Sequence, residues 1–272
     1  MYNVYDSPKN PITGHFKSIF NYRWLLFELI RVEFKLRYQS SFLGIIWMVL
    51  NPLLTAMVLF FVFRNVFQIR SINEVDFFSY VYSGVLILAF FTSALMDGSL
   101  QLRNNSSLLQ RVNVPGETFV LAKIFSNLIN FCISYAVLVL YMVLTNQDFS
   151  IAALEVIPLT FSLVLNTFAL ALLLSTLFSH FLDFEHLLRI FLMLLFYITP
   201  VFYSLEAITG ISREILQFNP IFYYLEIFRG SLGIVSYDNF LFVVVSSAFG
   251  IVLLTIALRV FNNRHWKLAF AQ

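Results

Sequence analysis

The sequence predicts an all-α integral membrane protein that forms one membrane domain over residues 1–272, and three observations support this fold class. Hydrophobic residues make up 60% of the chain and charged residues 12%, whereas soluble domains carry about 45–50% and about 25%. Several apolar runs reach the roughly 20 residues that cross the hydrocarbon core of a bilayer as a helix. Lys and Arg also gather on one side of these runs, as the topology of a membrane protein requires.

Six apolar runs are predicted to be transmembrane helices, over residues 42–63, 77–97, 121–144, 156–178, 187–205 and 239–260. If the N-terminus is cytoplasmic, only Arg64, Arg70, Arg213 and Arg229 of the 17 Lys and Arg residues fall outside. This bias follows the positive-inside rule and places both termini in the cytoplasm. Pro200 interrupts the fifth run, and a transmembrane helix tolerates such a proline when neighbouring groups satisfy the freed carbonyl.

The stretch before the first run, RVEFKLRY, alternates charged and apolar residues. A period of two is typical of a half-buried strand, but a lone strand at a bilayer would leave its backbone unpaired. A helix over about residues 24–38 has two polar faces, with Glu28, Arg31 and Lys35 on one and Glu33 and Arg37 on the other. One face can meet water and headgroups while the other meets a protein partner. Alternatively, the basic residues simply bind anionic lipid.

Residues 206–233 are too polar to cross a membrane and too apolar for a simple loop. We predict two short helices here that dip into the outer leaflet before the last span. Ser212 is the expected N-cap of the first. Asn219, followed by a proline, is the expected N-cap of the second, which Gly230 and Gly233 could end. An amphipathic surface loop is the alternative interpretation.

No catalytic or nucleotide-binding motif is found. The sequence lacks a G-x-x-x-x-G-K-[ST] loop and even a Gly-Lys pair, so another subunit must handle any ATP. A net charge of +2 is too small to indicate nucleic-acid binding. His180, Asp183, Glu185 and His186 look like metal ligands, but without an H-E-x-x-H spacing a solvated or interhelical cluster is favoured. Asp97, at the inner end of the second run, is a functional candidate by its position.

A neutral, hydroxyl-rich cargo would need few charges inside the bundle, because the C–H faces of sugars can slide along aromatic rings. Aromatic residues gather in the first and fifth runs, although lipid-facing packing explains most such residues in any membrane protein. The residues placed on a substrate path are Trp47, Phe60, Phe191, Phe196, Tyr197, Phe202 and Tyr203.

Five segments carry a resemblance to a known family. They are KLRYQSSFLGIIWMVLNPLL at 35–54, YVYSGVL at 80–86, NNSSLLQRVNVPGE at 104–117, FLDFEHLL with the later TPVFY at 181–203, and FNPIFYYLEIFRGSLG at 218–233. The most specific is R-Y-x-x-S-x-L-G-x-x-W-x-x-x-N-P. The chain resembles the membrane subunits of ABC exporters for cell-surface polysaccharides, the permeases for O-antigen, capsule and teichoic acid. It departs from them at Val32-Glu33 and Leu182-Asp183, where the family often has an Arg-Asp pair.

The resemblance implies a homodimeric permease with six transmembrane helices per subunit, a cytoplasmic interfacial helix before the first and re-entrant helices before the last. It implies export of a lipid-linked polysaccharide, most closely lipopolysaccharide O-antigen, across the bacterial inner membrane. ATP and Mg would bind to two copies of a separate ATPase subunit, and this chain would carry no cofactor. The alternatives are a permease for teichoic acid, capsule or a drug-like amphiphile, a membrane-embedded glycan transferase, and a passive channel. For the transferase, no acid/base or nucleophile set is found.

The resemblance also assigns roles to residues of this sequence. The ATPase-coupling residues are Glu28, Arg31, Glu33, Lys35 and Arg37 on the interfacial helix, and Asn104, Asn105, Leu108, Leu109, Gln110 and Arg111 on a coupling helix at about 104–111. The residues at the channel mouth are Tyr223, Tyr224, Glu226 and Arg229.

Overall fold

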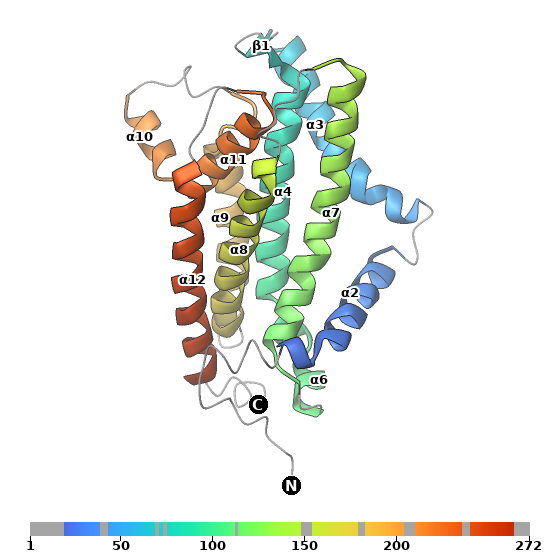
Figure 1. The fold of residues 1–272 in the computed structure, drawn as a ribbon, viewed down its shortest axis with the longest axis vertical. Helices are drawn as coiled ribbons and strands as arrows, with labels where there is room; N and C mark the ends of the chain where they lie inside the picture. The colour runs from blue at the N-terminus through green and yellow to red at the C-terminus, as the bar shows by residue number, and fades with distance from the viewer. Residues whose placement is uncertain are drawn as a thin grey trace.

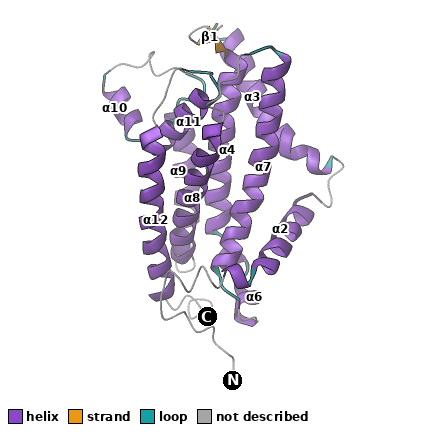
Figure 2. Cartoon of the chain, viewed as in Figure 1, coloured by secondary structure: helices purple, strands orange, loops and turns teal. Residues whose placement is uncertain are grey.

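The computed structural model describes residues 19–38, 43–68, 71–72, 75–111, 114–147, 154–178, 183–203, 210–235 and 240–263. Within these ranges the chain is a bundle of helices with one short antiparallel ladder, β1 (Ser71–Ile72) with β2 (Val75–Asp76) (Figures 1 and 2). The predicted all-α class is confirmed. The helices are α2 (Arg23–Tyr38), the 3-10 turn η1 (Gly44–Ile46), α3 (Trp47–Asn65), α4 (Phe77–Ser99), α5 (Gln101–Asn104), α6 (Ser106–Arg111), α7 (Glu117–Leu144), α8 (Val156–Phe178), α9 (Asp183–Ile198), α10 (Ile211–Gln217), α11 (Pro220–Ser231) and α12 (Phe240–Asn263).

By length and composition, five of the described helices could cross a membrane, namely α3, α4, α7, α8 and α12. Helix α9 has 16 residues, or about 24 Å at 1.5 Å per residue, which is short for a hydrocarbon core of about 30 Å. Helix α9 does not coincide with the predicted fifth span, 187–205, whose bounds stay a prediction. The helix begins at Asp183 and ends at Ile198. The expectation of six spans stays a prediction.

Pro200 ends helix α9 and does not kink it. The Thr199 N–H still donates to the Leu195 carbonyl at 2.9 Å, but Pro200 has no N–H and cannot continue the helix. The Thr199 hydroxyl accepts a hydrogen bond from the Asn219 side-chain amide at 2.9 Å. The end of α9 is thereby fixed against the start of α11.

Helix α4 is the centre of the bundle. Helices α3, α7, α8, α9 and α11 all contact it, and most of its residues are buried. Asp76 caps its N-terminus, because the carboxylate accepts the backbone N–H of Ser79 at 3.0 Å. Gly98 lets α8 approach closely, since a Cβ there would lie 3.0 Å from the Ala171 Cβ. These five helices are thus arranged around one buried, apolar helix.

The two short helices α10 and α11 occupy the region predicted for them. The N-cap assigned to Asn219 is confirmed, because its side chain accepts a backbone N–H of the first turn of α11. The N-cap assigned to Ser212 is wrong, since α10 already begins at Ile211. Helix α11 continues through Gly230 and ends before Gly233, whose φ of 77° suits a left-handed C-terminal turn. A location of these helices within the outer leaflet stays a prediction.

Arg229 lies inside the bundle and not at a surface. Its side chain is wholly buried, and the guanidinium lies over the Tyr80 ring with its carbon 3.5 Å from the ring centroid. It forms an ion pair with Glu226 at 2.8 Å. It donates to the carbonyls of Pro200, Val201 and Tyr80 at 2.9, 2.9 and 3.0 Å, and more weakly to the Ser83 hydroxyl at 3.4 Å. One side chain therefore joins α11 to α4 and to the chain just after α9.

Two of the four residues assigned to the channel mouth, Arg229 and Tyr224, are buried in this structure. A Cβ at position 84 would lie 2.9 Å from the Arg229 guanidinium, so Gly84 makes room for the arginine within α4. The Tyr224 side chain is also buried, and its hydroxyl bonds to the Ser162 hydroxyl at 2.8 Å and to the Asn166 amide at 3.1 Å. The channel-mouth role of the four residues stays a prediction. Glu226 and Tyr223 keep partial exposure.

We expect Arg229→Met to lower the free energy of unfolding by about 3–5 kcal/mol, because it leaves Glu226 and three carbonyls without their buried cation. The measurement is the unfolding midpoint of the purified chain in detergent. Arg259→Met is the matched control, since Arg259 is exposed on α12. Equal midpoints for the two variants would contradict the structural role of Arg229.

Candidate functional site

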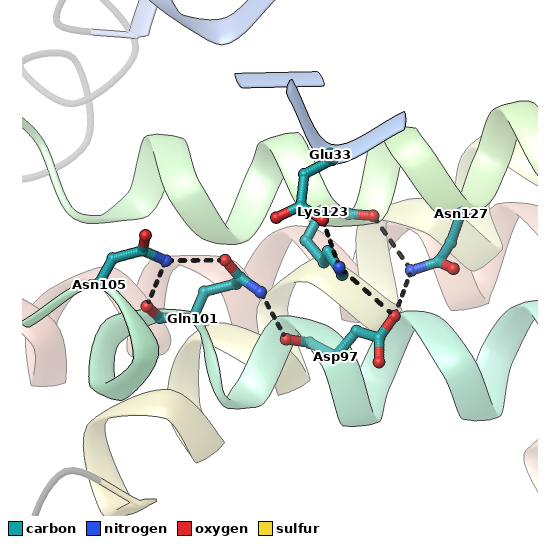
Figure 3. Close-up of polar contacts among 6 residues, drawn as sticks. All are labelled: Glu33, Asp97, Gln101, Asn105, Lys123 and Asn127. Carbon is teal, nitrogen blue, oxygen red and sulfur yellow. Dashed lines mark hydrogen bonds and ion pairs between the residues drawn. The ribbon is translucent and has the colours of Figure 1, made fainter. Parts of the chain in front are cut away.

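Six polar side chains join α2, α4, α5 and α7 at the end of the bundle that carries α6. We call them the basal cluster, which consists of Glu33, Asp97, Gln101, Asn105, Lys123 and Asn127 (Figure 3). Glu33 comes from α2, while Lys123 and Asn127 come from the first part of α7. The other three come from the end of α4, from α5 and from the residue that follows α5.

Lys123 is the centre of the basal cluster. Its ammonium forms an ion pair and a short hydrogen bond with the Glu33 carboxylate and lies 3.9 Å from the Asp97 carboxylate (Figure 3). The Lys123 side chain is only 14% exposed, and an ammonium at that depth is costly unless anions accompany it. The lysine therefore holds α2 against α7 and α4.

Amide side chains extend this contact toward α6. Asn127 donates to the Asp97 carboxylate at 3.4 Å. Gln101 donates to the Asp97 backbone carbonyl at 3.2 Å, and Asn105 donates to the Gln101 side-chain oxygen at 3.0 Å. A continuous series of polar contacts thus runs from α2 to Asn105, the residue between α5 and α6 (Figure 3).

A second set of ion pairs fixes α5 to α9. Arg103 on α5 contacts Glu185 at 3.0 Å, and Glu185 also pairs with Arg189 at 3.1 Å, one turn later on α9. Glu185 is therefore part of an interhelical polar cluster, as the sequence suggested. Asp183 and His186 are exposed, and His180 lies outside the described residues. Among the described residues no group of three His, Cys, Asp or Glu side chains could hold a metal ion.

The two leucines of the predicted coupling helix have different surroundings. Leu109 on α6 is 3% exposed and belongs to the hydrophobic core, whereas Leu108 is 43% exposed. Asn104, Gln110 and Arg111 are also exposed. Leu109 therefore anchors α6 in the core and is too buried to serve as a docking contact. Leu108 presents an apolar side chain at the surface.

The two polar faces of α2 are now distinguished. Glu33 faces α7 through Lys123, so its partner is within the chain. On the opposite face Glu28 and Arg31 form an exposed ion pair at 3.3 Å, and Lys35 is exposed. The Arg37 side chain lies outside the described residues. Among the described side chains of the two polar faces, those of Glu28, Arg31 and Lys35 are the exposed ones and can meet water, headgroups or another protein.

Four of the predicted path aromatics, at positions 196, 197, 202 and 203, contact one another through their rings at the end of α9 and just after it. Trp47 and Phe196 line a common cavity. Phe60 packs on the rings of Phe77 and Phe78. Phe202 also stacks on Phe63, with ring centroids 4.3 Å apart. The Tyr203 hydroxyl donates to the Ile198 carbonyl at 2.8 Å. Phe191 and Tyr197 are exposed on α9.

Ion pairs and amide contacts of this kind can transmit a displacement of one helix to its neighbours, because they join rigid elements through few, directional contacts. The sequence named Glu33, Asp97 and Asn105 but not Lys123, Gln101 or Asn127 as candidates. A signal for Lys123 was present, since a lysine that opens a long apolar helix requires a partner. Nothing local in the sequence identifies that partner.

Comparisons with known proteins agree with the resemblance found in the sequence. Residues 25–233 match the family model described as ABC-2 type transporter. The chain is 27% identical over 251 residues to an O-antigen export system permease protein RfbA of Klebsiella pneumoniae, covering 90% of this chain and 95% of the relative. A protein of the same name from Myxococcus xanthus is 32% identical over 213 residues, covering 75% of this chain and 78% of the relative.

We expect Lys123→Met to loosen α2, because Glu33 loses the cation that it pairs with on α7, and α2 loses its polar attachment to that helix. Backbone amides of α2 should exchange hydrogen severalfold faster, as measured by mass spectrometry. Lys35→Met is the matched control, because Lys35 is exposed on the other face. Adding Glu33→Gln to Lys123→Met should cause little further change, and additive effects would contradict the pairing.

Proposed function

The chain belongs to the ABC-2 type transporter family, and we propose that it is the permease subunit of an ATP-driven exporter of lipid-linked O-antigen polysaccharide. The observation that supports this proposal most directly is the similarity to O-antigen export permeases across 90% of the chain. The apolar helices make it a multi-pass membrane protein, and the family makes it a transport subunit that works with an ABC ATPase. In this proposal the membrane is the bacterial inner membrane, with both termini in the cytoplasm.

We propose that the partner ATPase binds the exposed side of α6 and the face of α2 that carries Glu28, Arg31 and Lys35. Leu108 supports this position, because its apolar side chain is 43% exposed on a short polar helix, where a docked partner would cover it. Two ATPase copies would hold the ATP and Mg, since the sequence contains no P-loop. This chain itself would carry no cofactor.

We further propose that two copies of the chain form the path. Helix α3 buries only Met48 and Ala56, and α9 buries three leucines while Phe191 and Tyr197 are exposed. These faces need lipid or a second copy to cover them, and a homodimer would place the aromatics along the interface. Helix α9 would then act as the sixth span despite its 16 residues.

The proposed mechanism couples the ATPase to this path through the basal cluster. ATP binding draws the two ATPase subunits together and displaces α2 and α6. Because Lys123 and Asp97 connect α2 to α4, that displacement reaches the helix that forms the core of the bundle. ATP must favour one of two arrangements of α2 for such coupling to transmit work.

Deletion of the gene should remove O-antigen from the cell surface, while the lipid-linked precursor accumulates inside and sensitivity to drugs stays unchanged. Surface polysaccharide is measured by gel electrophoresis of lipopolysaccharide, and a plasmid copy of the chain should restore it. Intact surface O-antigen together with raised drug sensitivity would instead support the small-amphiphile alternative. Transfer of sugar by the purified chain without ATP would support a transferase.

Leu108→Asp should abolish export while leaving the chain folded, because it places a charge on the proposed contact and not in the core. Ser107→Asp is the matched control, since Ser107 is also exposed on α6 and adds the same charge without removing apolar surface. The readouts are surface O-antigen and co-purification of the ATPase. Normal export by Leu108→Asp would refute the docking position. Leu109→Asp is expected to unfold the region, because Leu109 is buried.

A further inference from the structure

Helix α3 carries a proline in its interior, at Pro52, and stays helical through it from Trp47 to Asn65. Pro52 has no N–H, so it cannot donate to the carbonyl of Met48, four residues earlier. A transmembrane helix tolerates such a proline when a neighbouring helix or a Ser or Thr side chain supplies the missing donor. Pro52 therefore interrupts the hydrogen-bond ladder of α3 at a point where another group has to complete it.

The donor comes from α7. The Ser134 hydroxyl donates to the Met48 carbonyl at 3.2 Å, and the serine is buried. Ser134 is itself held in place, because the hydroxyl of the buried Tyr82 on α4 donates to the Ser134 carbonyl at 3.2 Å. The ladder of α3 is thus completed by one side chain that two other helices position.

A second feature weakens α3 at the same turn. The Thr55 hydroxyl donates to the Asn51 carbonyl at 2.8 Å. Such a bond from Ser or Thr to the carbonyl four residues earlier slightly destabilises a helix and often bends it. In Figure 1 the start of α3 reaches outward past α7, whereas its later turns rise alongside α4. Residues 51–55 are therefore the turn at which α3 bends most easily.

The later part of α3 is fixed on α4. Ala56 is wholly buried. The Phe60 ring packs on the rings of Phe77 and Phe78 at the start of α4, with centroids 6.0 and 5.7 Å away. A tilt of residues 56–65 would break these apolar and ring contacts.

The first part of α3 instead borders an open cavity of about 700 Å³. All five residues that α3 contributes to the lining lie between positions 47 and 55. The facing wall comes from residues within 85–97 of α4 and 127–134 of α7, together with Phe196. Met48 and Ser134 both belong to the lining, so water in the cavity can donate to the Met48 carbonyl once the serine releases it. The start of α3 therefore has both room to move and a replacement donor.

We propose that Pro52 is a hinge in α3 and that the Ser134–Met48 hydrogen bond closes it. At 3.2 Å this bond is longer than the roughly 2.7–2.8 Å usual for a hydroxyl donor, so it opens at little cost. When it opens, residues 47–51 change their tilt at the cavity while residues 56–65 stay on α4. Ser134 and Pro52 are thus positioning residues for the cavity-lining start of α3. This inference goes beyond the proposed function and does not depend on it.

The test measures hydrogen exchange of α3 by mass spectrometry, with the full chain and its ATPase in lipid nanodiscs. Ser134→Ala should accelerate exchange in peptides covering residues 47–55 about fivefold, the effect of losing a hydrogen bond worth about 1 kcal/mol. Pro52→Ala should slow it, because the new N–H can donate to the Met48 carbonyl. In the Pro52→Ala background, Ser134→Ala should change exchange by less than about twofold, since the carbonyl no longer needs the hydroxyl.

Ser126→Ala is the matched control. Ser126 is also a buried serine of α7, but its hydroxyl has no hydrogen-bond partner in the described part of the chain. This variant should leave exchange at residues 47–55 unchanged. Peptides covering residues 56–65 are the internal reference, and they should exchange at the same rate in every variant.

Equal acceleration of residues 47–55 and 56–65 by Ser134→Ala would overturn the hinge, because α3 would then open as one unit. An equal effect of Ser134→Ala with and without Pro52 would show that the serine acts by packing and not through the Met48 carbonyl. Unchanged exchange in Ser134→Ala would refute the closing bond. The readout needs no cargo, so the hinge can be rejected while surface O-antigen still depends on the chain.

Discussion

Burial of the Arg229 guanidinium is the interaction on which the α11 end of the bundle depends. A charge cannot enter an apolar interior alone, so its surroundings must be built to receive it. Helix α4 presents the Tyr80 carbonyl and a glycine at position 84, and the chain after α9 turns so that the carbonyls of Pro200 and Val201 point at the arginine. The arginine consequently links three features of the fold. These are the position of α11, the place where α9 ends, and the need for a glycine at position 84 of α4.

At the opposite end of the bundle a buried cation must also be paired, but its partners are more exposed to water. Lys123 is shared by two carboxylates, and the side chains of Glu33 and Asp97 remain 26% and 34% exposed. Water can therefore replace either partner at a moderate cost, which is not true around Arg229. One end of the bundle is held by a wholly buried cation and the other by a partly hydrated one. This asymmetry suits a permease that is driven from a single side.

Local signals predicted local features well. The bounds of α8 and the Asn219 cap follow from apolar length and cap chemistry, which neighbouring residues determine. Long-range pairings were missed, because Glu33 and Lys123 are 90 residues apart and no pattern in either segment names the other. Arg229 looked like an exposed charge for the same reason. The different burial of Leu108 and Leu109 depends on how α6 is rotated, and a six-residue helix carries too little periodicity to reveal that.

Two residues of the basal cluster, Asp97 and Asn127, also line the cavity to which Trp47 and Phe196 contribute, so the attachment of α2 and the wall of this cavity depend on the same side chains. In the present structure Lys123 divides its charge between Glu33 and Asp97. If α2 moves and withdraws Glu33, the ammonium is left with Asp97 alone, and the Asn127 amide loses part of its acceptor. The hydrogen-bonding groups that Asp97 and Asn127 present to the cavity would then change, while the part of the lining that comes from α3 would not. A motion imposed on α2 would thereby alter the polar wall of the cavity without requiring the helices of the bundle to repack.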